Sequence, residues 1–412
     1  LAGYDGAMFP WQSGSDGREE SQTMHLNPIS GRWIPDHTYL ERHIGLAVAY
    51  SVWQYYQITA DLDFMRFYGT EMLVEIARFW ASKARYNEAR GRYEILEVMG
   101  PDEFHERYPG ADRPGIDNNA YTNVMAVWTL CRASDALELL PAECRGDLRD
   151  RLSISNHELE RWDDISRRMV VPFHGDGIIS QFEGYDDLEE LDWDALRASA
   201  GDIHRLDRVL EARGDTPDRY KVSKQADVLM LFYLLSADEL GELFDRLGYR
   251  MEHNTIPKTI DYYMQRTSHG STLSRVVHAW VLSRSNRDMS WSLFLEALRS
   301  DVSDIQGGTT HEGIHLGAMA GTVDMVQRCY SGLEVRKGVL WFEPRLPVGL
   351  RKLRFGIEYR RNRVEVDIGK DVLRVYSRPQ DVAPVLVGFR GAVHELAPGG
   401  TLEFKLDRKG QR

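Results

Sequence analysis

The spacing of apolar residues changes once along the chain, and this change constrains the fold more than any other feature. From about Tyr39 to Tyr330, apolar residues recur at spacings typical of amphipathic helices. After Tyr330 they alternate, or form short β-branched runs between turn residues, which indicates strands. We therefore predict a mainly helical body at residues 1–334, followed by a small antiparallel β-sandwich domain at residues 335–412.

The same patterns predict the individual elements and the loops between them. Helices are expected at residues 39–59, 63–84, 119–140, 222–236, 270–283, 291–299 and 312–330, and strands at 339–342, 353–359, 364–368, 373–376 and 392–396. Long polar connections, notably residues 91–118 and 301–311, separate the helices. Binding residues tend to lie on such loops, so we expect the functional site there.

Composition excludes several classes of function. The chain has 51 basic and 63 acidic residues and a net charge of −12, which argues against the basic surface that nucleic acids require. No apolar run approaches the roughly 18 residues of a membrane span. Cys131, Cys144 and Cys329 are too few and too far apart for a disulfide framework or a zinc site, which favours a reducing cytoplasm. We expect a small-molecule ligand, no nucleic acid and no membrane.

Two polar motifs in the first long loop indicate sugar chemistry. Residues 100–105 read Gly-Pro-Asp-Glu-Phe-His, where a helical pattern gives way to a loop, and Glu103 there can act as an acid. Residues 117–123 read Asp-Asn-Asn-Ala-Tyr-Thr-Asn, and the amides of Asn118 and Asn119 can hydrogen-bond sugar hydroxyls. Inverting glycosidic cleavage needs a carboxylic acid that protonates the leaving oxygen. We interpret Glu103 as that acid; the alternative is a helix cap or a solvated carboxylate.

Other candidate residues lie outside this loop. Lys224 and Gln225 precede a strongly apolar run, and on the opening turn of a buried helix they could donate to sugar hydroxyls. Taken alone they are an ordinary solvated helix start. Trp11 can stack on a sugar ring. Residues 268–274 open another helix, where a plain Ser/Thr cap is the alternative to a ligand site.

Residues 311–315 match the zinc-protease pattern HExxH, but we expect no metal there. The preceding Gly-Gly-Thr-Thr stretch puts His311 at or before the helix start, and Gly313 lies inside the motif. Glycine, threonine and histidine beside a helix N-terminus favour an anion site instead.

Taken together, the motifs resemble glycoside hydrolase family 65 over nearly the whole chain. They occur in the family's order: GYDGAMFPWQS from Gly3, GPDEFH from Gly100, DNNAYTN from Asp117, KQADVL from Lys224, HGSTLS from His269 and TTHEGIHLGAMAGT from Thr309. The resemblance implies an inverting phosphorylase for maltose, trehalose, kojibiose or a related α-glucoside, or one of the family's hydrolases. It also implies an (α/α)6 barrel between an N-terminal β-sandwich and a small C-terminal β-domain.

The resemblance also implies roles for individual residues. Glu103 is the general acid, Lys224 and Gln225 bind the glucosyl unit, and His43 lies on the substrate side. His315, Ser271 and Thr272 form the site for inorganic phosphate, the co-substrate, and no cofactor is expected.

The attacking group is the point on which the sequence leaves alternatives. The family's phosphorylases usually carry paired serines where this chain has Ser271 and Thr272. Our first interpretation is phosphorolysis, in which an α-glucoside and phosphate yield β-glucose 1-phosphate and a sugar. The second is hydrolysis with Glu312 as the general base that activates water. The third is a sugar-binding protein without catalysis.

The resemblance finally implies parts of the fold with no counterpart before Leu1. These are the N-terminal sandwich, the first barrel helices and a Trp-Asp segment that helps to hold the sugar. A barrel without its first helices would expose apolar faces. We therefore expect a truncated barrel that an N-terminal fragment or chain of the same enzyme completes; homodimers are common in the resembled family.

Overall fold

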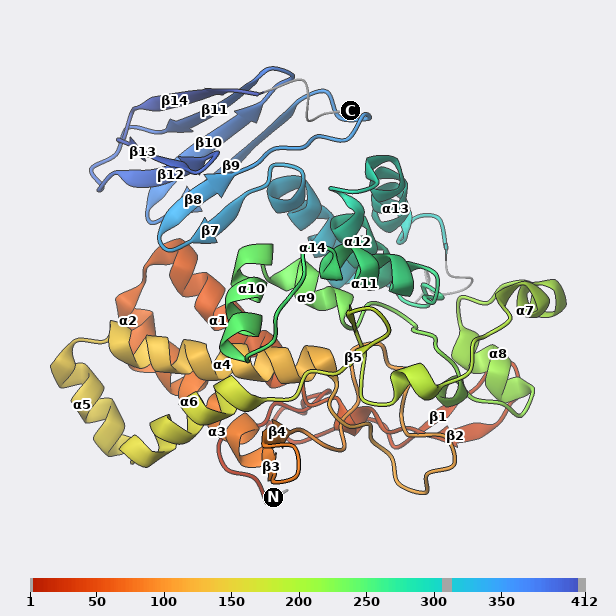
Figure 1. Ribbon diagram of the computed structural model, residues 1–412. Helices are drawn as coiled ribbons and strands as arrows, with labels where there is room; N and C mark the ends of the chain where they lie inside the picture. Colours follow the sequence, from red (N-terminus) through yellow and green to blue (C-terminus); the bar gives the residue numbers. More distant parts are fainter. Residues whose placement is uncertain (1–2, 306–312, 407–412) are drawn as a thin grey trace. The chain divides into compact units, whose positions relative to one another are not determined.

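The computed structural model describes residues 3–305 and 313–406 of the chain (Figure 1). The chain divides into two compact units. Unit 1 comprises Leu1–Trp53 and Leu62–Ser274, and unit 2 comprises Gln54–Asp61 and Arg275–Arg412. The boundary between the two compact units thus falls after Ser274. The domain boundary expected from the sequence, after residue 334, stays a prediction.

Unit 1 is built mainly from helices, as the apolar spacing predicts, with short antiparallel hairpins between them. Its helices are α1 (Ile44–Thr59, which ends in unit 2), α2 (Leu62–Phe64), α3 (Thr70–Lys83), α4 (Ala120–Leu139), α5 (Ala142–Arg151), α6 (Asn156–Arg168), α7 (Trp193–Ala200), α8 (Leu206–Ala212), α9 (Leu229–Leu234), α10 (Ala237–Arg246) and α11 (Thr255–Met264). The hairpins pair β1 (Met24–Leu26) with β2 (Trp33–Pro35), β3 (Arg85–Asn87) with β4 (Arg92–Glu94), and β5 (Phe173–His174) with β6 (Ile178–Ile179).

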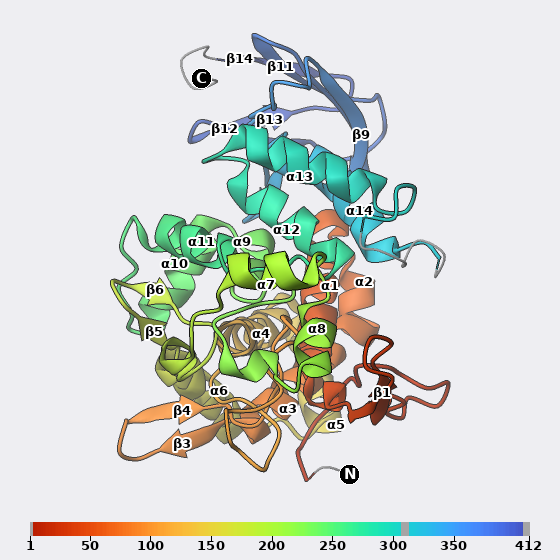
Figure 2. The ribbon, with the colours of Figure 1, turned by 90° about the vertical axis from the view of Figure 1, so that its right-hand side faces the viewer.

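Helix α4 forms the centre of unit 1. Each residue from Ala120 to Leu130 is buried, and a helix that is buried on every face has to be surrounded by other elements. Helices α3, α6, α9 and α10 contact it, and Figure 2 views it nearly end-on. Trp80, Trp128 and Trp162 fill the surrounding core with fully buried rings. The N-terminus of α4 is therefore a fixed point, and the candidate site lies beside it.

The structure confirms several predicted helices and corrects one that matters for function. Helices α1, α3, α4 and α12 (Thr272–Leu282) lie inside predicted ranges. The predicted helix at 222–236 is wrong over its first half, because helix α9 begins at Leu229. Lys224 and Gln225 therefore lie in an irregular segment before the helix rather than on its opening turn. Short polar helices such as α5, with Leu148 as its buried residue, carry too little apolar periodicity to predict.

Unit 2 contains helices followed by strands. Besides α12, which begins in unit 1, it holds α13 (Arg287–Arg299) and α14 (Leu316–Asp324), which continues as a π-helical turn at Met325–Cys329. Its strands are β7 (Glu334–Arg336), β8 (Val339–Phe342), β9 (Leu353–Tyr359), β10 (Asn362–Ile368), β11 (Val372–Ser377), β12 (Val385–Phe389), β13 (Ala392–Leu396) and β14 (Thr401–Lys405). A sheet of order β14-β11-β10-β9 faces a sheet of order β13-β12-β8-β7.

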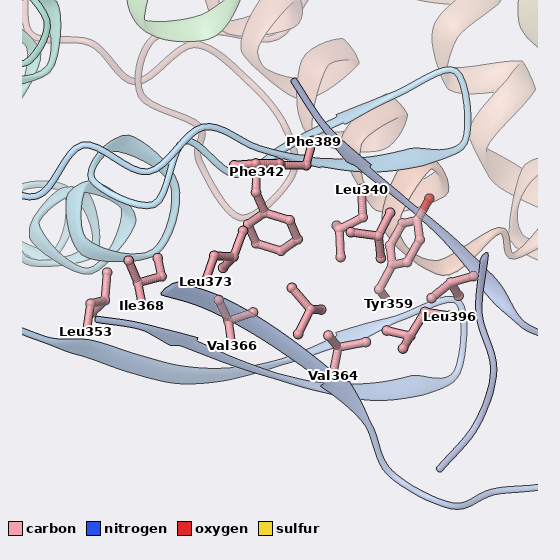
Figure 3. Packing of buried hydrophobic residues seen from close by; sticks show 13 residues of the cluster. Leu340, Phe342, Leu353, Tyr359, Val364, Val366, Ile368, Leu373, Phe389 and Leu396 are labelled. Carbon is pink, nitrogen blue, oxygen red and sulfur yellow. The ribbon is translucent and has the colours of Figure 1, made fainter. Parts of the chain in front are cut away.

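Alternating apolar residues of both sheets meet in one core, as Figure 3 shows. In β10, for example, Val364, Val366 and Ile368 point inward and are fully buried. The prediction of a β-sandwich is confirmed, but its antiparallel order is wrong at one pair, because β8 and β12 run parallel. The reason is topological: the chain crosses to the other sheet for β9 to β11 before it returns beside β8.

Two further observations concern the described residues as a set. None of their helices combines the length and the apolarity needed to cross a membrane. They also contain no cluster of histidine, cysteine, aspartate and glutamate side chains that could hold a metal, although His311 and Glu312 lie outside them. Cys131, Cys144 and Cys329 are free thiols.

Candidate active site

The loop at residues 100–105 turns one carboxyl outward and buries its other side chains. Phe104 packs in an apolar cluster with residues of α7 and α8. Asp102 and His105 are fully buried and joined by a 2.9 Å bond from Nδ1 of the histidine to Oδ2 of the aspartate. Glu103, with a left-handed φ of 62°, keeps 20% of its side chain exposed. The loop therefore presents Glu103 as its reactive group.

Gly100 is required by the close approach of two buried side chains. A Cβ at this position would overlap Oδ2 of Asp227 and Nδ2 of Asn119. Asn119 caps α4 by accepting a bond from Thr122 N at 2.9 Å, and its Nδ2 lies 3.1 and 3.0 Å from the two carboxyl oxygens of Asp227. The loop that carries Glu103 thus rests directly on the N-terminus of the central helix.

Both carboxylate oxygens of Glu103 accept hydrogen bonds from predicted site residues. Nζ of Lys224 donates to Oε2 at 2.7 Å, and Nε2 of Gln225 donates to Oε1 at 2.8 Å. Gln225 also donates to Pro101 O at 2.7 Å, which ties its amide to the backbone of the same loop. The structure therefore brings together residues that are more than a hundred positions apart in the sequence.

Backbone pairing, rather than a helix, fixes Lys224. Ser223 N donates to Arg266 O and Ser268 N donates to Ser223 O, so the two segments run side by side as a parallel bridge. Gly270 N then donates to Lys224 O at 2.8 Å. A Cβ on Gly270 would overlap His204 O, which explains the glycine of the His-Gly-Ser motif. The motifs at residues 224 and 269 are therefore one structural unit.

A second group of polar residues lies beside the Glu103 loop. Met99 N donates to Leu40 O at 3.1 Å, which places the segment of Glu41 and His43 against the loop. The ring of His43 lies between those of Trp11 and Tyr121, at centroid distances of 5.7 and 5.8 Å. Burial lowers the pKa of His43 to about 4, so the imidazole is neutral.

Sequence analysis missed Glu41, although it stands two positions before His43. Its side chain is fully buried, and Oε2 lies 3.8 Å from Nε2 of His43. Burial, reinforced by the negative charge of Glu103, raises the pKa of Glu41 well above its ordinary value. Neither oxygen has a hydrogen-bond partner among the described residues. Residue type alone gives no sign of this burial.

Asn118 and Asn119, predicted as sugar binders, are fully buried and bonded within the chain. Asn118 accepts from Ile95 N at 3.2 Å and donates to Oε2 of Glu183 at 2.6 Å. Asn119 caps α4 and holds Asp227, as described above. In this structure both amides shape the loop.

The residues predicted to bind phosphate fall in both units. In unit 1, Ser271 is half-buried and its Oγ accepts from Leu273 N at 3.3 Å, as a helix-capping hydroxyl does, while Thr272 is buried at the start of α12. In unit 2, Nδ1 of His315 lies 2.6 Å from Oδ1 of Asp301, whose Oδ2 accepts from the His315 backbone N. Glu312 lies outside the described residues. The site that would join these residues stays a prediction.

The families and proteins that the chain matches are consistent with the motifs of the site. Residues 1–324 match the glycosyl hydrolase family 65 central catalytic domain, and residues 333–396 match the C-terminal domain of that family. An uncharacterized glycosyl hydrolase of Mycobacterium tuberculosis is 55% identical over 99% of this chain, which covers 31% of that protein.

Named phosphorylases are also similar to the chain. Trehalose 6-phosphate phosphorylase of Lactococcus lactis is 40% identical over 88% of this chain, and kojibiose phosphorylase of Caldanaerobacter subterraneus is 34% identical over 91% of it. The chain spans 46% of the length of each. A solved structure of a human-microbiome protein, provisionally named a kojibiose phosphorylase, shares the fold, with a TM-score of 0.77 over 98% of this chain and 54% of that one at 24% identity.

Proposed function

The chain belongs to glycosyl hydrolase family 65, and we propose that it cleaves an α-linked glucoside by inverting phosphorolysis. Glu103 would protonate the glycosidic oxygen while phosphate attacks the anomeric carbon from the opposite face of the ring. The products would be β-glucose 1-phosphate and the released sugar. Phosphate is already an anion, so this reaction needs no general base.

The observation that carries the proposal is the pairing of Glu103 with Lys224 and Gln225. An ammonium and an amide hold both oxygens of a partly exposed carboxylate at 2.7 and 2.8 Å. Ligand pockets place a few donors of this kind, which can bind the hydroxyl groups of a sugar. A glucosyl unit that accepts bonds from Lys224 and Gln225 would leave Glu103 to carry the proton for the leaving group. Trp11, beside His43, offers a ring face for the same sugar.

The attacking group is inferred from the relatives and from His315. Several similar proteins are named phosphorylases. The bond from Nδ1 of His315 to Asp301 would leave Nε2 as the ring nitrogen that binds a ligand, because a carboxylate partner fixes the tautomer of a histidine. Ser271 and Thr272, at the start of the 11-residue helix α12, can add hydroxyl and backbone donors for an anion.

The runner-up is inverting hydrolysis with Glu312 as general base. It would require about 6.5 to 9.5 Å between the two carboxyl groups, with a water between them. The uncharacterized relative named a glycosyl hydrolase keeps this reaction open. A sugar-binding protein without turnover is the third candidate.

Several architectural expectations accompany the proposal. We propose that the helices of this chain belong to an (α/α)6 barrel and that the enzyme assembles as a homodimer. Free cysteines fit a reducing compartment such as the cytoplasm.

The decisive experiment measures product formation from a panel of glucose disaccharides with and without phosphate. The panel should contain trehalose, its 6-phosphate, kojibiose and maltose. We expect strict phosphate dependence and a β-configured glucose 1-phosphate, and release of free glucose without phosphate would reject phosphorolysis. Glu103→Gln should abolish turnover, whereas Asp112→Asn, an exposed acid in the same loop, should not. An active Glu103→Gln variant would sink both enzymatic candidates.

A further inference from the structure

A buried network of acids lies behind Glu103, and the proposed mechanism does not use it. Asp102 and His105 of the Glu103 loop are fully buried, and Asp227, just before α9, is 3% exposed. Asn119 at the N-terminus of α4 donates to Asp227 at 3.0 Å. The backbone N–H of Asp102 also donates to Asp227. The loop, the central helix and the segment of Lys224 therefore meet at this carboxyl.

His105 is bonded at both ring nitrogens. His105 contacts a carboxylate oxygen of Asp102 at 2.9 Å through Nδ1 and the carbonyl of Tyr220 at 3.0 Å through Nε2. A carboxylate at Nδ1 and a carbonyl at Nε2 both favour a donating ring nitrogen and so stabilise the imidazolium, while Nε2 of Gln181 lies further away, 3.4 Å from Nδ1. Burial alone lowers the pKa of His105, but the charge and hydrogen bond of Asp102 outweigh it and raise that pKa. Asp102 is thus the partner of His105 in a buried salt bridge.

The amide of Asn119 and the backbone N–H of Asp102, which donate to Asp227, are neutral groups. The titratable groups that act on it are Asp102 on the loop, Tyr121 of α4 and Tyr263 of α11, and none of these three supplies a positive charge. An ionised Asp227 would be a second buried anion beside Asp102, and such pairs hold one proton between them. Burial first, and then the charge of Asp102, raise the pKa of Asp227 well above its ordinary value. One oxygen of Asp102 is also buried without a partner among the described residues, so it can accept a bond from an acid proton.

We propose that Asp227 works as an un-ionised carboxylic acid and is a positioning residue for Glu103. Its neutral form lets the loop at Gly100 rest directly on the N-terminus of α4, where a Cβ would already overlap Asp227. Ionisation would place two like charges in the gap and push the loop outward. Glu103 would then leave the donors that hold it at 2.7 and 2.8 Å.

The kinetic test of this inference rests on the proposed function, whereas the spectroscopic test does not. The first measurement is infrared spectroscopy of the purified protein at neutral pH, compared between the wild type and Asp227→Asn. We expect the difference spectrum, wild type minus variant, to show the carbonyl stretch of one protonated carboxylic acid, because the bands of other acids with a raised pKa, such as Glu106, cancel in it. Identical spectra would overturn the proposal, whatever reaction the enzyme catalyses.

The second measurement is steady-state kinetics of two variants. Asp227→Asn keeps the shape and the neutrality of the acid, so kcat should stay within about threefold of the wild type. Asp227→Leu keeps neutrality but removes the acceptors for Asn119 and Asp102; we expect kcat to fall by about a hundredfold, the size of effect that a misplaced catalytic group produces, with a smaller change in KM. An Asp227→Asn variant that folds but is as inactive as Asp227→Leu would mean that the carboxyl is needed as an anion, and would overturn the proposal. Asp227→Asn decides the question even where Asp227→Leu fails to fold.

Discussion

Replacing Gly100 with alanine tests whether the Glu103 loop rests on the N-terminus of α4. The added Cβ would overlap Oδ2 of Asp227 and Nδ2 of Asn119. Both side chains are short and buried, so neither can swing aside as the end of a long flexible chain would. The loop itself has to move, and overpacking of this kind costs about 1–3 kcal/mol.

The same displacement should reach the candidate acid. Glu103 is three positions further along the loop, and its bonds to Lys224 and Gln225 measure 2.7 and 2.8 Å. A shift of about 1 Å takes these contacts beyond hydrogen-bond range, and misplacement of that size lowers turnover about a hundredfold. We therefore expect Gly100→Ala to lose both stability and activity.

The measurements are urea unfolding and turnover, with a matched control. Tryptophan fluorescence reports the core of unit 1, because Trp80, Trp128 and Trp162 are fully buried there. Gly146→Ala is the control: its Cβ meets nothing within 4 Å on the exposed face of α5, so the variant should gain up to about 1 kcal/mol from helix propensity and keep full activity. A Gly100→Ala protein as stable and as active as the wild type would refute the reasoning.

Three further predictions concern charge. Lys224→Met should lower the free energy of unfolding by only about 1 kcal/mol, because the partly exposed ion pair with Glu103 is screened. It should nevertheless lower kcat/KM about a hundredfold. An unchanged kcat/KM would show that Lys224 is not part of the site. The pKa of His43 is depressed by burial to about 4, so stability should be complete above the ordinary value of 6.5 and fall as the pH drops toward 4; His43→Gln should flatten this slope in pH-dependent urea unfolding. Burial, and then the charge of Asp218, raise the pKa of Glu106 to about 8, so its contribution is present below 4.5 and is lost as the pH rises through 8; Glu106→Gln should be the more stable protein at pH 8, and equal stability there would contradict the assignment.

The sequence predicted the residues of the candidate site better than their structural setting. Glu103, Lys224 and Gln225 were identified from motifs, and the structure brings them into hydrogen-bond contact. Their placement could not be predicted, because Lys224 is held by backbone pairing with residues 266–270, which are distant in the chain. The apolar run after Gln225 suggested a helix from residue 222, but residues 222–228 are irregular and the helix begins at Leu229.

The two asparagines show why polar motifs are hard to interpret. A cluster of amides suggests a ligand that carries hydroxyl groups. The side chains of Asn118 and Asn119, however, form hydrogen bonds with other groups of the chain. An irregular loop against a buried helix end leaves backbone N–H groups that need partners. Short amide side chains can form hydrogen bonds with these groups. The same residue types can therefore stabilise a loop or bind a sugar. Burial distinguishes the two roles, and burial is not visible in the sequence.

The parallel pair in the C-terminal sandwich has a comparable cause. Alternation of apolar residues predicted β8 and β9 separately from their partners, and each strand is where the pattern put it. Strand direction depends on which sheet the chain enters next. Since β9 to β11 lie in the other sheet, β12 returns beside β8 in the same direction. Apolar periodicity predicts which face of a strand is buried, but it does not predict which strands pair with it.

The residues of the Gly100–His105 motif therefore divide into structural and chemical roles, and the division bears on what substitution can achieve. Gly100, Asp102 and His105 serve the loop, through close approach and a buried ion pair, whereas Glu103 faces the donors that a sugar would use. A left-handed φ of 62° at a residue with a long side chain is uncommon and needs surrounding structure to maintain it. The buried neighbours supply that structure. A substitution inside the motif should therefore disturb the candidate acid before it alters selectivity among substrates.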